Sequence, residues 1–274
     1  MTLIGVDGCR FGWVAASADA SEWPRLGGFA LLERFWELLD SLAARPAIIA
    51  VDMPIGLAAN APRRCDLEAR RLLGPPRGSC VFPAPCRAAL AAADDYRQAC
   101  ELNRQASQRA LSRQCFGILP KVKQIEHVLT PERQSWIREA HPEVTFAVLS
   151  AEGRGLAASK KTRLGRDERL RLLGELAAGV DLLAQRARLG WANVAPDDLV
   201  DALACLATAQ RICSGAARSL PTGDPEYDQR GLRMEIVAER LSCGASPRSA
   251  GRSCRRGLRG WPRSRPRPSG PARG

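Results

Sequence analysis

The sequence predicts an α/β fold in which helices flank a mixed β-sheet and a largely helical insertion interrupts the order of the elements. Three observations support this. Continuous apolar runs at residues 2–7 and 47–52 each end in an aspartate, as expected of buried strands. Between them lies a segment with apolar residues at helical spacing. A well-patterned helix at residues 196–212 has one apolar side to pack on the sheet.

The N-terminal part of the chain supplies most of the predicted sheet. Residues 2–7 and 13–17 are predicted strands joined by the GCRFG turn, and together they form a hairpin. Residues 28–32 are a third candidate strand. Residues 33–44 are a predicted helix that stops before Pro46. The strand at 47–52 follows, so the order is strand, strand, strand, helix, strand.

A largely helical insertion is predicted at residues 63–114. Residues 64–73 and 88–111 have helical patterns, and the segment 74–87 between them is proline-rich and predicted to be a loop. Residues 121–128 are predicted to form a further helix.

The rest of the body completes the predicted fold. Residues 144–149 are the candidate fifth strand, and residues 166–190, with their regularly placed leucines, are predicted to form one long helix. Residues 231–237 are a candidate closing edge strand. No internal repeat is evident.

The composition changes abruptly near residue 240. Residues 241–274 contain nine Arg and no Asp, Glu or Lys, so the formal net charge of +12 leaves 12 − 9 = +3 for residues 1–240. We predict an α/β domain at 1–240 and a disordered Arg-rich tail at 241–274. A frame-shifted reading of a GC-rich gene is an alternative explanation of the tail. The small charge of the body does not imply a broad basic face for nucleic acid.

Cysteine usage and hydropathy bound the cellular setting. The chain has ten Cys but no C-x-x-C pair, and no His stands at zinc-ligand spacing, so no structural zinc site is predicted. No charged-then-apolar leader is present, and no apolar run approaches the roughly 18 residues of a membrane span. We expect a cytoplasmic protein with reduced thiols and no membrane partner. The sequence does not predict an oligomeric state.

Four aspartates are the candidate catalytic residues and metal ligands. Asp7 and Asp52 each end a predicted strand, and Asp198 and Asp201 lie at the start of the helix at 196–212. Gathered carboxylates raise each other's pKa unless a cation lies among them. Hard divalent cations such as Mg²⁺ prefer oxygen ligands. If the fold brings both strand ends to the start of that helix, the four residues predict a site for Mg²⁺ or Mn²⁺.

Each aspartate also has a purely structural explanation. Asp7 and Asp52 fit Asx-turns, in which the carboxylate accepts hydrogen bonds from nearby backbone N–H groups. Asp197 or Asp198 fits a helix N-cap, and Asp201 fits a favourable position in the helix dipole. Three acids within five positions exceed what capping requires. The context of the two strand-end acids therefore favours the metal interpretation.

Other polar residues are candidates for the same site. Glu143 follows His141 and Pro142 at a predicted strand entrance and is a further candidate metal ligand, whereas His141 is a ligand, a base or a turn residue. Four basic residues are candidate contacts for substrate phosphates: Lys121, Lys160, Lys161 and Arg163. A solvated loop before a helix explains the last three equally well.

A series of motifs resembles one known family. GVDGCRFGWV, VDMPIGL, RRCDLEARRLLG with CVFPAPCR, LSRQCFGILPK, HPEVTFAVL, KKTRLGR, DDLVDAL and GLRMEIV occur in this order. Together they closely resemble the domain-of-unknown-function 429 family, whose members are described as predicted RNase H-like nucleases. The resemblance spans roughly residues 2–240. One departure is Gln124, where the family pattern leads us to expect an acid.

The resemblance implies an RNase H-like core with Asp7 on the first strand and Asp52 at the end of the fourth. The stretch from Asp198 is also similar to the last-helix motif of Holliday-junction resolvases, which implies a metal-ligand role for Asp198 and Asp201. The implied function is a divalent-metal-dependent nuclease that hydrolyses phosphodiester bonds of DNA or RNA. Two Mg²⁺ or Mn²⁺ ions about 4 Å apart would be bridged by Asp7.

Two other classes of function stay open. A nucleotide-binding or phosphotransferase protein of the actin-like superfamily shares this core, but usually needs two such domains and glycine-rich phosphate loops, which the sequence lacks. A non-catalytic RNase H-like binding protein fits the mild charge of the body and the insertion at 63–114. The sequence does not distinguish DNA from RNA or one substrate structure from another.

Overall fold

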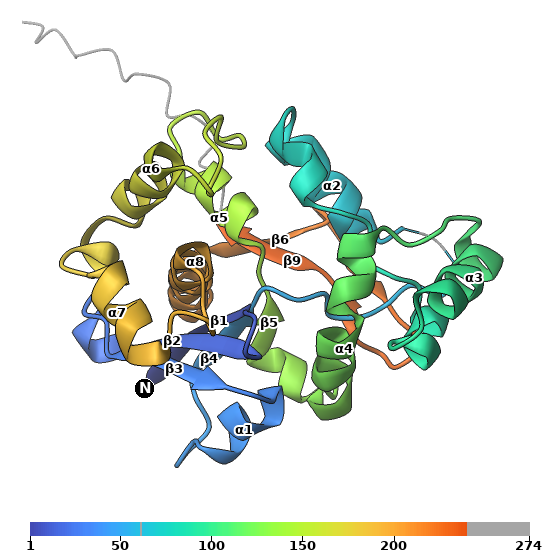
Figure 1. The fold of residues 1–274 in the computed structure, drawn as a ribbon, viewed down its shortest axis with the longest axis horizontal. Coiled ribbons are helices and arrows are strands. Elements are labelled where there is room, and N and C mark those ends of the chain that lie inside the picture. Colours follow the sequence, from blue (N-terminus) through green and yellow to red (C-terminus); the bar gives the residue numbers. More distant parts are fainter. Residues whose placement is uncertain (61, 240–274) are drawn as a thin grey trace, which may run out of the picture. The chain divides into compact units, whose positions relative to one another are not determined.

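A mixed five-stranded β-sheet lies at the centre of the fold in the computed structural model, which describes residues 1–60 and 62–239 (Figure 1). In spatial order the strands are β3 (Gly28–Leu32), β2 (Trp13–Asp19), β1 (Thr2–Gly8), β4 (Ile48–Val51) and β5 (Ile137–Glu139). The pairs β3–β2 and β2–β1 are antiparallel, and the pairs β1–β4 and β4–β5 are parallel. The predicted α/β class and its mixed sheet are confirmed. The tail predicted at 241–274 lies outside the described residues.

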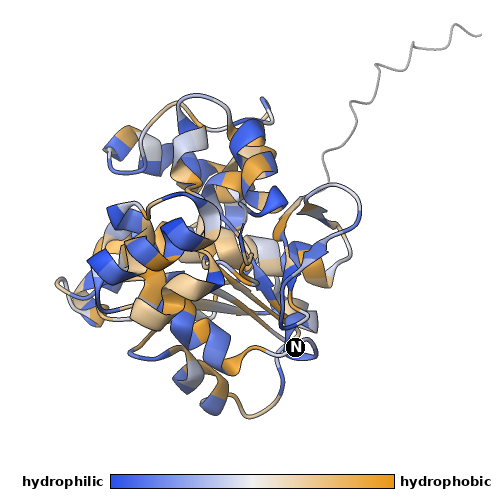
Figure 2. Cartoon of the chain, turned by 90° about the vertical axis from the view of Figure 1, so that its right-hand side faces the viewer, coloured by the Kyte–Doolittle hydropathy of each residue, from blue (hydrophilic) through white to orange (hydrophobic). Residues whose placement is uncertain are grey.

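Helices cover both faces of the sheet. Their bounds are α1 (Phe35–Asp40), α2 (Arg64–Leu73), α3 (Tyr96–Ser107), α4 (Arg113–Val128), α5 (Pro142–Leu149), α6 (Arg163–Leu173), α7 (Leu182–Leu189) and α8 (Pro196–Cys213). One face packs against α8, beside which lie α6 and α7, and the opposite face packs against α1 and α4 (Figure 1). In Figure 2 the helix ribbons are banded with hydrophobic and hydrophilic residues, as expected of helices with one buried side.

The two faces follow from the alternation of side chains along each strand. Leu3 of β1 and Ala50 of β4 pack into the core formed with α8. Ile4 and Val51 point to the opposite face and pack into the core formed with α1 and α4. Because both faces are buried, the central strands are apolar throughout, and this continuous pattern made them recognisable in the sequence.

Helix α8 touches the backbone of β1 at Gly5. A Cβ atom on Gly5 would lie 2.0 Å from the backbone nitrogen of Leu206 and 2.3 Å from the carbonyl oxygen of Ala202. Only a glycine permits so close an approach of helix to strand. The contact places the first turns of α8 over the carboxyl end of β1, on the sheet face to which Leu3 points.

The prediction of a fifth strand at residues 144–149 was wrong. These residues belong to α5, and the fifth strand is β5, which precedes it. Val144, Phe146 and Ala147 are all buried, so the segment lacks the one-sided pattern that distinguishes a surface helix from a strand. Pro142 occupies the first turn of α5, a position where proline is favoured because its missing N–H is not needed.

Glycine residues divide the single helix predicted at 166–190. The chain forms α6 and α7, separated by a short 3₁₀ turn and a loop. Gly174 and Gly179 have φ angles of 58° and 76°, in the left-handed region that ends helices.

The single helix predicted at 88–111 is also divided into two. It becomes a 3₁₀ helix at Arg87–Ala92 and then α3, which Asp95 caps.

Three further elements differ in extent or partner. Helix α1 is shorter than the predicted 33–44, whereas α4 begins eight residues before the predicted 121–128. The segment predicted to form one edge strand at 231–237 is divided into two short strands. It forms β8 (Arg233–Met234), which pairs with β7 (Glu226–Tyr227), and β9 (Ile236–Glu239), which pairs with β6 (Ala217–Leu220). These are two small antiparallel ribbons, and a single parallel bridge between Val237 of β9 and Ala140 links the second ribbon to the end of β5.

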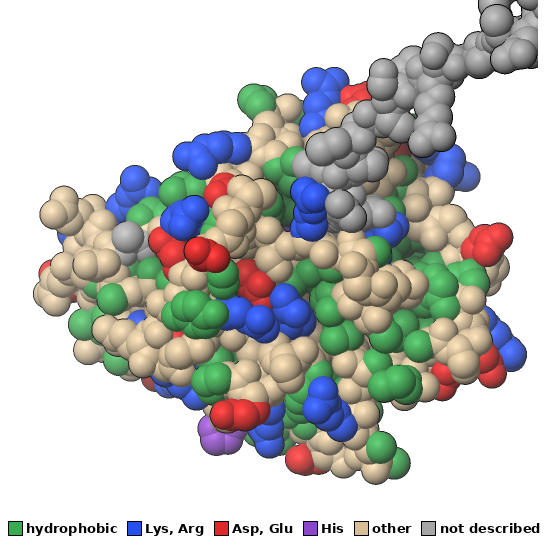
Figure 3. Space-filling view, turned by 180° about the vertical axis from the view of Figure 1, so that it is seen from behind, with side chains coloured by type: hydrophobic (Ala, Val, Ile, Leu, Met, Phe, Trp, Pro, Cys, Tyr) green, Lys and Arg blue, Asp and Glu red, His purple; other side chains and the backbone are tan. Residues whose placement is uncertain are grey.

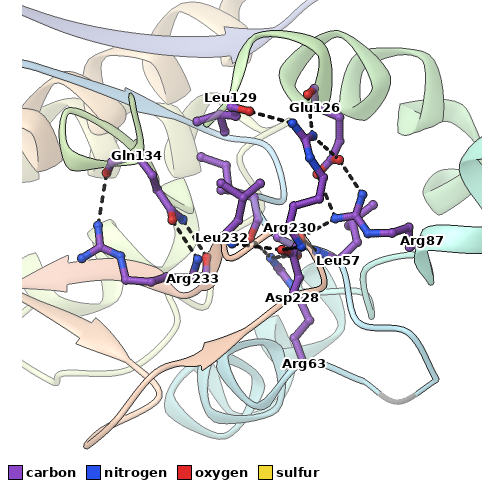
Figure 4. A network of polar contacts seen from close by, with 12 residues as sticks. Leu57, Arg63, Arg87, Glu126, Leu129, Gln134, Asp228, Arg230, Leu232 and Arg233 are labelled. Carbon is purple, nitrogen blue, oxygen red and sulfur yellow. Dashed lines mark hydrogen bonds and ion pairs between the residues drawn. The ribbon is translucent and has the colours of Figure 1, made fainter. Parts of the chain in front are cut away.

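A polar network ties the 63–114 insertion and α4 to the C-terminal ribbons (Figure 4). Arg87 donates to Glu126 of α4 at 2.6 Å and also pairs with Asp228. Arg230 donates to the same Glu126 at 2.7 Å, and the N–H of Leu57 donates to Asp228 at 3.1 Å. These contacts hold together segments that lie far apart in the sequence.

The contact at Gly5 yields a stability prediction. Gly5→Ala should lower the free energy of unfolding by about 3 kcal/mol or more, because α8 must move away from β1. Gly117→Ala, within α4, is the matched control. Nothing lies within 4 Å of its added Cβ, and removing a helical glycine should raise stability by about 0.5–1 kcal/mol. Urea unfolding measures both. Equal, small effects of the two substitutions would contradict the role of Gly5.

Candidate active site

Asp7 and Asp52 lie side by side at the carboxyl ends of two adjacent parallel strands. Asp7 is in β1, Asp52 directly follows β4, and the N–H of Asp52 donates to the carbonyl of Val6 at 2.9 Å. By the alternation of the strands, Asp7 shares the face of Leu3, which is the face that α8 covers. Asp7 Oδ1 also accepts a hydrogen bond of 2.8 Å from the N–H of Gly8, so the turn interaction exists as well.

Asp201 of α8 joins the two strand-end acids. Its side chain is 1% exposed and that of Asp7 is 7% exposed. Burial raises the pKa of Asp7 well above its ordinary value, and the nearby Asp52 and Asp201 raise it further. Burial likewise raises the pKa of Asp201 to about 7, although Lys160 opposes the shift. The pKa of Asp52 is also raised by burial, against the lowering effect of His141 and Lys160. The three carboxyl groups therefore lie close together, with Asp7 and Asp201 buried and Asp52 half-buried.

Lys160 supplies a positive charge to this cluster. Its Nζ forms an ion pair with Asp201 Oδ2. Burial disfavours the charged lysine, but Asp201, Asp7 and Asp52 outweigh that effect and raise the pKa of Lys160 above its ordinary value. The cluster thus contains one ammonium group and three carboxyl groups.

Two buried polar atoms at the site have no hydrogen-bond partner within residues 1–60 and 62–239. They are Asp201 Oδ1 and His141 Nδ1. Buried polar atoms are nearly always satisfied, so an orphaned carboxylate oxygen and an orphaned imidazole nitrogen in one cleft indicate the place of a ligand. His141 and Asp52 line the same cleft, and the charge of the histidine lowers the pKa of Asp52.

The acids open into a cleft of about 690 Å³. Asp7, Asp52 and Asp201 line it, and so do His141 and Glu143. Three of the predicted phosphate contacts also line it: Lys121, Lys160 and Lys161. The fourth, Arg163, does not. Its side chain is 91% exposed and lies 3.7 Å from Asp167. Acidic and basic candidate residues from both halves of the sequence thus line the same cleft.

Asp198 has a different position from the other three aspartates. It is in the first turn of α8, where Oδ2 accepts a hydrogen bond of 2.8 Å from the N–H of Ala195, the N-cap residue. It does not line the cleft. Burial raises its pKa, and the Ala195 N–H opposes the shift. The capping explanation thus describes the observed geometry of Asp198, and its metal-ligand role stays a prediction.

Glu143 is held by an arginine. Arg169 of α6, which is fully buried, donates to both carboxylate oxygens of Glu143 at 2.7 and 2.9 Å. A paired, bidentate carboxylate is a poorer metal ligand than a free one, since the arginine must be displaced or shared. Glu143 lines the cleft, and its role as a ligand also stays a prediction.

Sequence reasoning missed a second ionic cluster in the cleft. Arg63 donates to Glu139 at 2.7 Å and pairs with Asp66 at 2.5 Å, and all three are buried and line the cleft. Burial raises the pKa of Glu139 to about 7, opposed by Arg63. Glu139 ends β5 as Asp52 follows β4, so it is a third strand-end acid. An acid at the end of an apolar strand is recognisable in a sequence, but Glu139 was missed because the fifth strand was predicted at 144–149.

The position at which the resemblance led us to expect an acid lies elsewhere. Gln124 Oε1 accepts hydrogen bonds from Trp13 Nε1 at 2.8 Å and from the N–H of Phe35 at 2.9 Å. These donors belong to the opposite side of the sheet from α8. Gln124 therefore braces α1 and β2 and does not line the cleft.

The oxygen atoms of the acids are the type of donor that a divalent cation binds, but the described residues do not form a complete ligand set. No group of three or more His, Cys, Asp or Glu side chains in the part of the chain that the structure describes is arranged to hold a metal ion. Asp201 faces Lys160 with one oxygen, and its other oxygen is unpartnered. Oxygen donors from Asp7, Asp52 and Asp201 are the type that Mg²⁺ and Mn²⁺ prefer.

Three general features of the molecule accompany the site. On the face seen in Figure 3, acidic and basic side chains are interspersed, in agreement with the small charge of the body. No helix among residues 1–60 and 62–239 has the length and apolar character to cross a membrane. The eight cysteines of these residues are all free.

Comparison with known proteins gives one match. The family model described as "Protein of unknown function (DUF429)" matches residues 5–226. No curated protein and no solved structure matches the chain. The matched range includes four strands of the central sheet, the end of β1 that carries Asp7, and every acid of the cleft. The chain therefore belongs to the DUF429 family.

Proposed function

We propose that this protein is a divalent-metal-dependent nuclease that hydrolyses phosphodiester bonds in nucleic acid. One observation carries the proposal. Asp7, Asp52 and Asp201 lie together in a cleft that Lys121, Lys160 and Lys161 also line. Acids that bind a metal and cations that bind phosphate are the two parts that metal-assisted phosphodiester hydrolysis requires.

The electrostatics of the acids support a functional role. Grouping buried carboxylates costs free energy, as the raised pKa values of Asp7, Asp52 and Asp201 show. Titratable groups in a cleft, perturbed by burial and by specific charged partners, are typical of active sites. A purely structural Asx-turn requires one aspartate, not three that repel one another.

The residues divide into two roles. Asp7, Asp52 and the free Oδ1 of Asp201 would hold Mg²⁺ or Mn²⁺, which supplies Lewis acidity and a water of lowered pKa when bound. Lys121 and Lys161 would hold the phosphates of the substrate in the cleft. His141, whose Nδ1 is unpartnered, lies where it can hold a proton beside Asp52.

The strand order of the sheet gives secondary support to the RNase H-like assignment. Three antiparallel strands are followed by a helix and two parallel strands, and the acids lie where β1 and β4 end. A fold hosts many functions, so the site carries the proposal and the fold only agrees with it. The free thiols agree with a cytoplasmic location.

Asp7→Asn should abolish hydrolysis and leave the protein folded. The substitution removes a metal ligand and also removes one repelling charge, so the folded state loses little. Activity should fall by more than the roughly 10- to 100-fold loss that partners of metal ligands cause. Cleavage of labelled single- and double-stranded DNA and RNA with Mg²⁺ or Mn²⁺ measures the effect, and thermal melting verifies the fold.

Asp197→Asn is the matched control for this experiment. Asp197 lies in the first turn of α8 and does not line the cleft, so its substitution should leave hydrolysis unchanged. A folded Asp7→Asn protein with wild-type activity would sink the proposal. Wild-type protein that is folded but neither binds Mn²⁺ nor cleaves any of the substrates would favour a non-catalytic binding protein.

Binding of Mn²⁺ should strengthen as the pH rises from 6 to 8. The pKa of Asp201 is raised to about 7, so at pH 6 its carboxyl group holds a proton in most molecules, and the raised pKa of Asp7 acts in the same direction. A metal ion must displace the proton of Asp201, which costs up to about tenfold in affinity per pH unit. Calorimetry in two buffers of different ionisation enthalpy measures affinity and proton release. Equal affinity at both pH values, without proton release, would contradict the raised pKa values.

A further inference from the structure

Lys160 places a positive charge directly against one of the three aspartates proposed to bind the metal. Its ammonium group pairs with Asp201 Oδ2 and lies near Asp7 and Asp52. The other oxygen of Asp201 has no partner among the residues that the structure describes. The carboxylate of Asp201 thus has a lysine on one oxygen, while its other oxygen is buried and has no partner in the described residues. That arrangement fits one fixed ammonium group and one exchangeable metal ion.

The loop that carries Lys160 is held on both sides. Arg77 donates to the carbonyls of Leu156 and Ala157 at 2.7 and 2.9 Å, which ties the loop to the insertion. Arg169 donates to the carbonyl of Ala158 at 3.1 Å while it grips Glu143, which ties the loop to α5 and α6.

The backbone of Ser159, the residue before Lys160, is also fixed. Thr162, the N-cap of α6, donates its hydroxyl to the carbonyl of Ser159 at 2.8 Å and accepts from the N–H of Gly165. A Cβ on Gly165 would lie 2.1 Å from the carbonyl oxygen of Ser159, so the start of α6 is packed directly on the loop. The backbone that carries Lys160 is therefore fixed on either side, so its ammonium group can leave Asp201 only by a change in the torsion angles of its own side chain.

The charges of the cluster also favour one divalent ion over two. With Asp7, Asp52 and Asp201 ionised, the cluster carries three negative charges and Lys160 supplies one positive charge. A single divalent ion brings the sum to zero, because −3 + 1 + 2 = 0. Two divalent ions beside Lys160 would leave a net charge of +2 in a buried place, which is unfavourable.

We propose that Lys160 permanently replaces the second cation, so that the site binds a single divalent ion between Asp7, Asp52 and Oδ1 of Asp201. This inference rests on the proposed function, since it assumes that the site binds a metal. It changes the expected number of ions from two to one. It also gives Glu143 and Arg169 a positioning role, because the pair holds the loop from which Lys160 reaches Asp201.

Counting bound Mn²⁺ by electron paramagnetic resonance tests the inference. The wild-type protein should bind one Mn²⁺ per chain and show no exchange coupling. Lys160→Met should bind two, with the spectrum of coupled ions, because the place of the ammonium group is open. Two Mn²⁺ ions about 4 Å apart are close enough to couple.

Two control variants make the test specific. Lys161→Met removes the neighbouring lysine, which lines the same cleft but forms no ion pair within residues 1–60 and 62–239, and should still bind one Mn²⁺. Lys160→Arg keeps the positive charge and should also bind one. A melting curve in EDTA should show a lower midpoint for Lys160→Met than for Lys161→Met, since three carboxylates lose their counter-ion.

The outcomes separate this inference from the proposed function. Two coupled Mn²⁺ ions in the wild-type protein would overturn the role of Lys160 and leave the nuclease proposal intact. One ion in both the wild type and a folded Lys160→Met variant would do the same. No bound Mn²⁺ in the folded wild type would overturn the metal-dependent function and the inference with it. If Lys160→Met fails to fold, a wild-type count of two coupled ions would still overturn the inference.

Discussion

The close contact of α8 with β1 at Gly5 is the constraint on which the site depends. Asp7 and Asp52 become neighbours through strand pairing alone, since β1 and β4 are parallel and adjacent. Asp201 reaches them only because the helix backbone lies directly on the strand, without a side chain between them. A larger residue at Gly5 would separate the third acid from the first two. The absence of a side chain at Gly5 therefore allows the three aspartates to lie together.

That constraint forces carboxylates together, and the surrounding structure compensates for their repulsion. Lys160 neutralises part of the charge, and the pKa values of the acids are raised for the rest. Nearby, Arg169 pairs with Glu143, and Arg63 pairs with Glu139. Two buried polar atoms are left without partners at the place where the acids meet. Proteins retain such unfavourable features where they serve a function, which is why the site and not the fold carries our proposal.

Much of this arrangement could be predicted from the sequence. Continuous apolar runs identified β1 and β4, and the position of Asp7 and Asp52 at their ends followed directly. Other parts depend on tertiary contacts that no local pattern reports. The segment at 144–149 is apolar on all sides, so its helix could not be told from a strand. Asp198 and Asp201 looked equivalent in the sequence, but Asp198 caps its own helix and Asp201 enters the cleft. Glu139 was overlooked because its strand was assigned to the wrong residues.

The central claim is that Asp7, Asp52 and Asp201 form a binding site for a divalent metal ion. Anomalous diffraction at the manganese edge, from crystals of the protein soaked in Mn²⁺, tests it most directly. The account predicts an anomalous peak within ligand distance of oxygens from all three aspartates, with Lys160 still bound to Asp201. A map with no peak at these residues, from crystals in which the cleft is open to solvent, would contradict it.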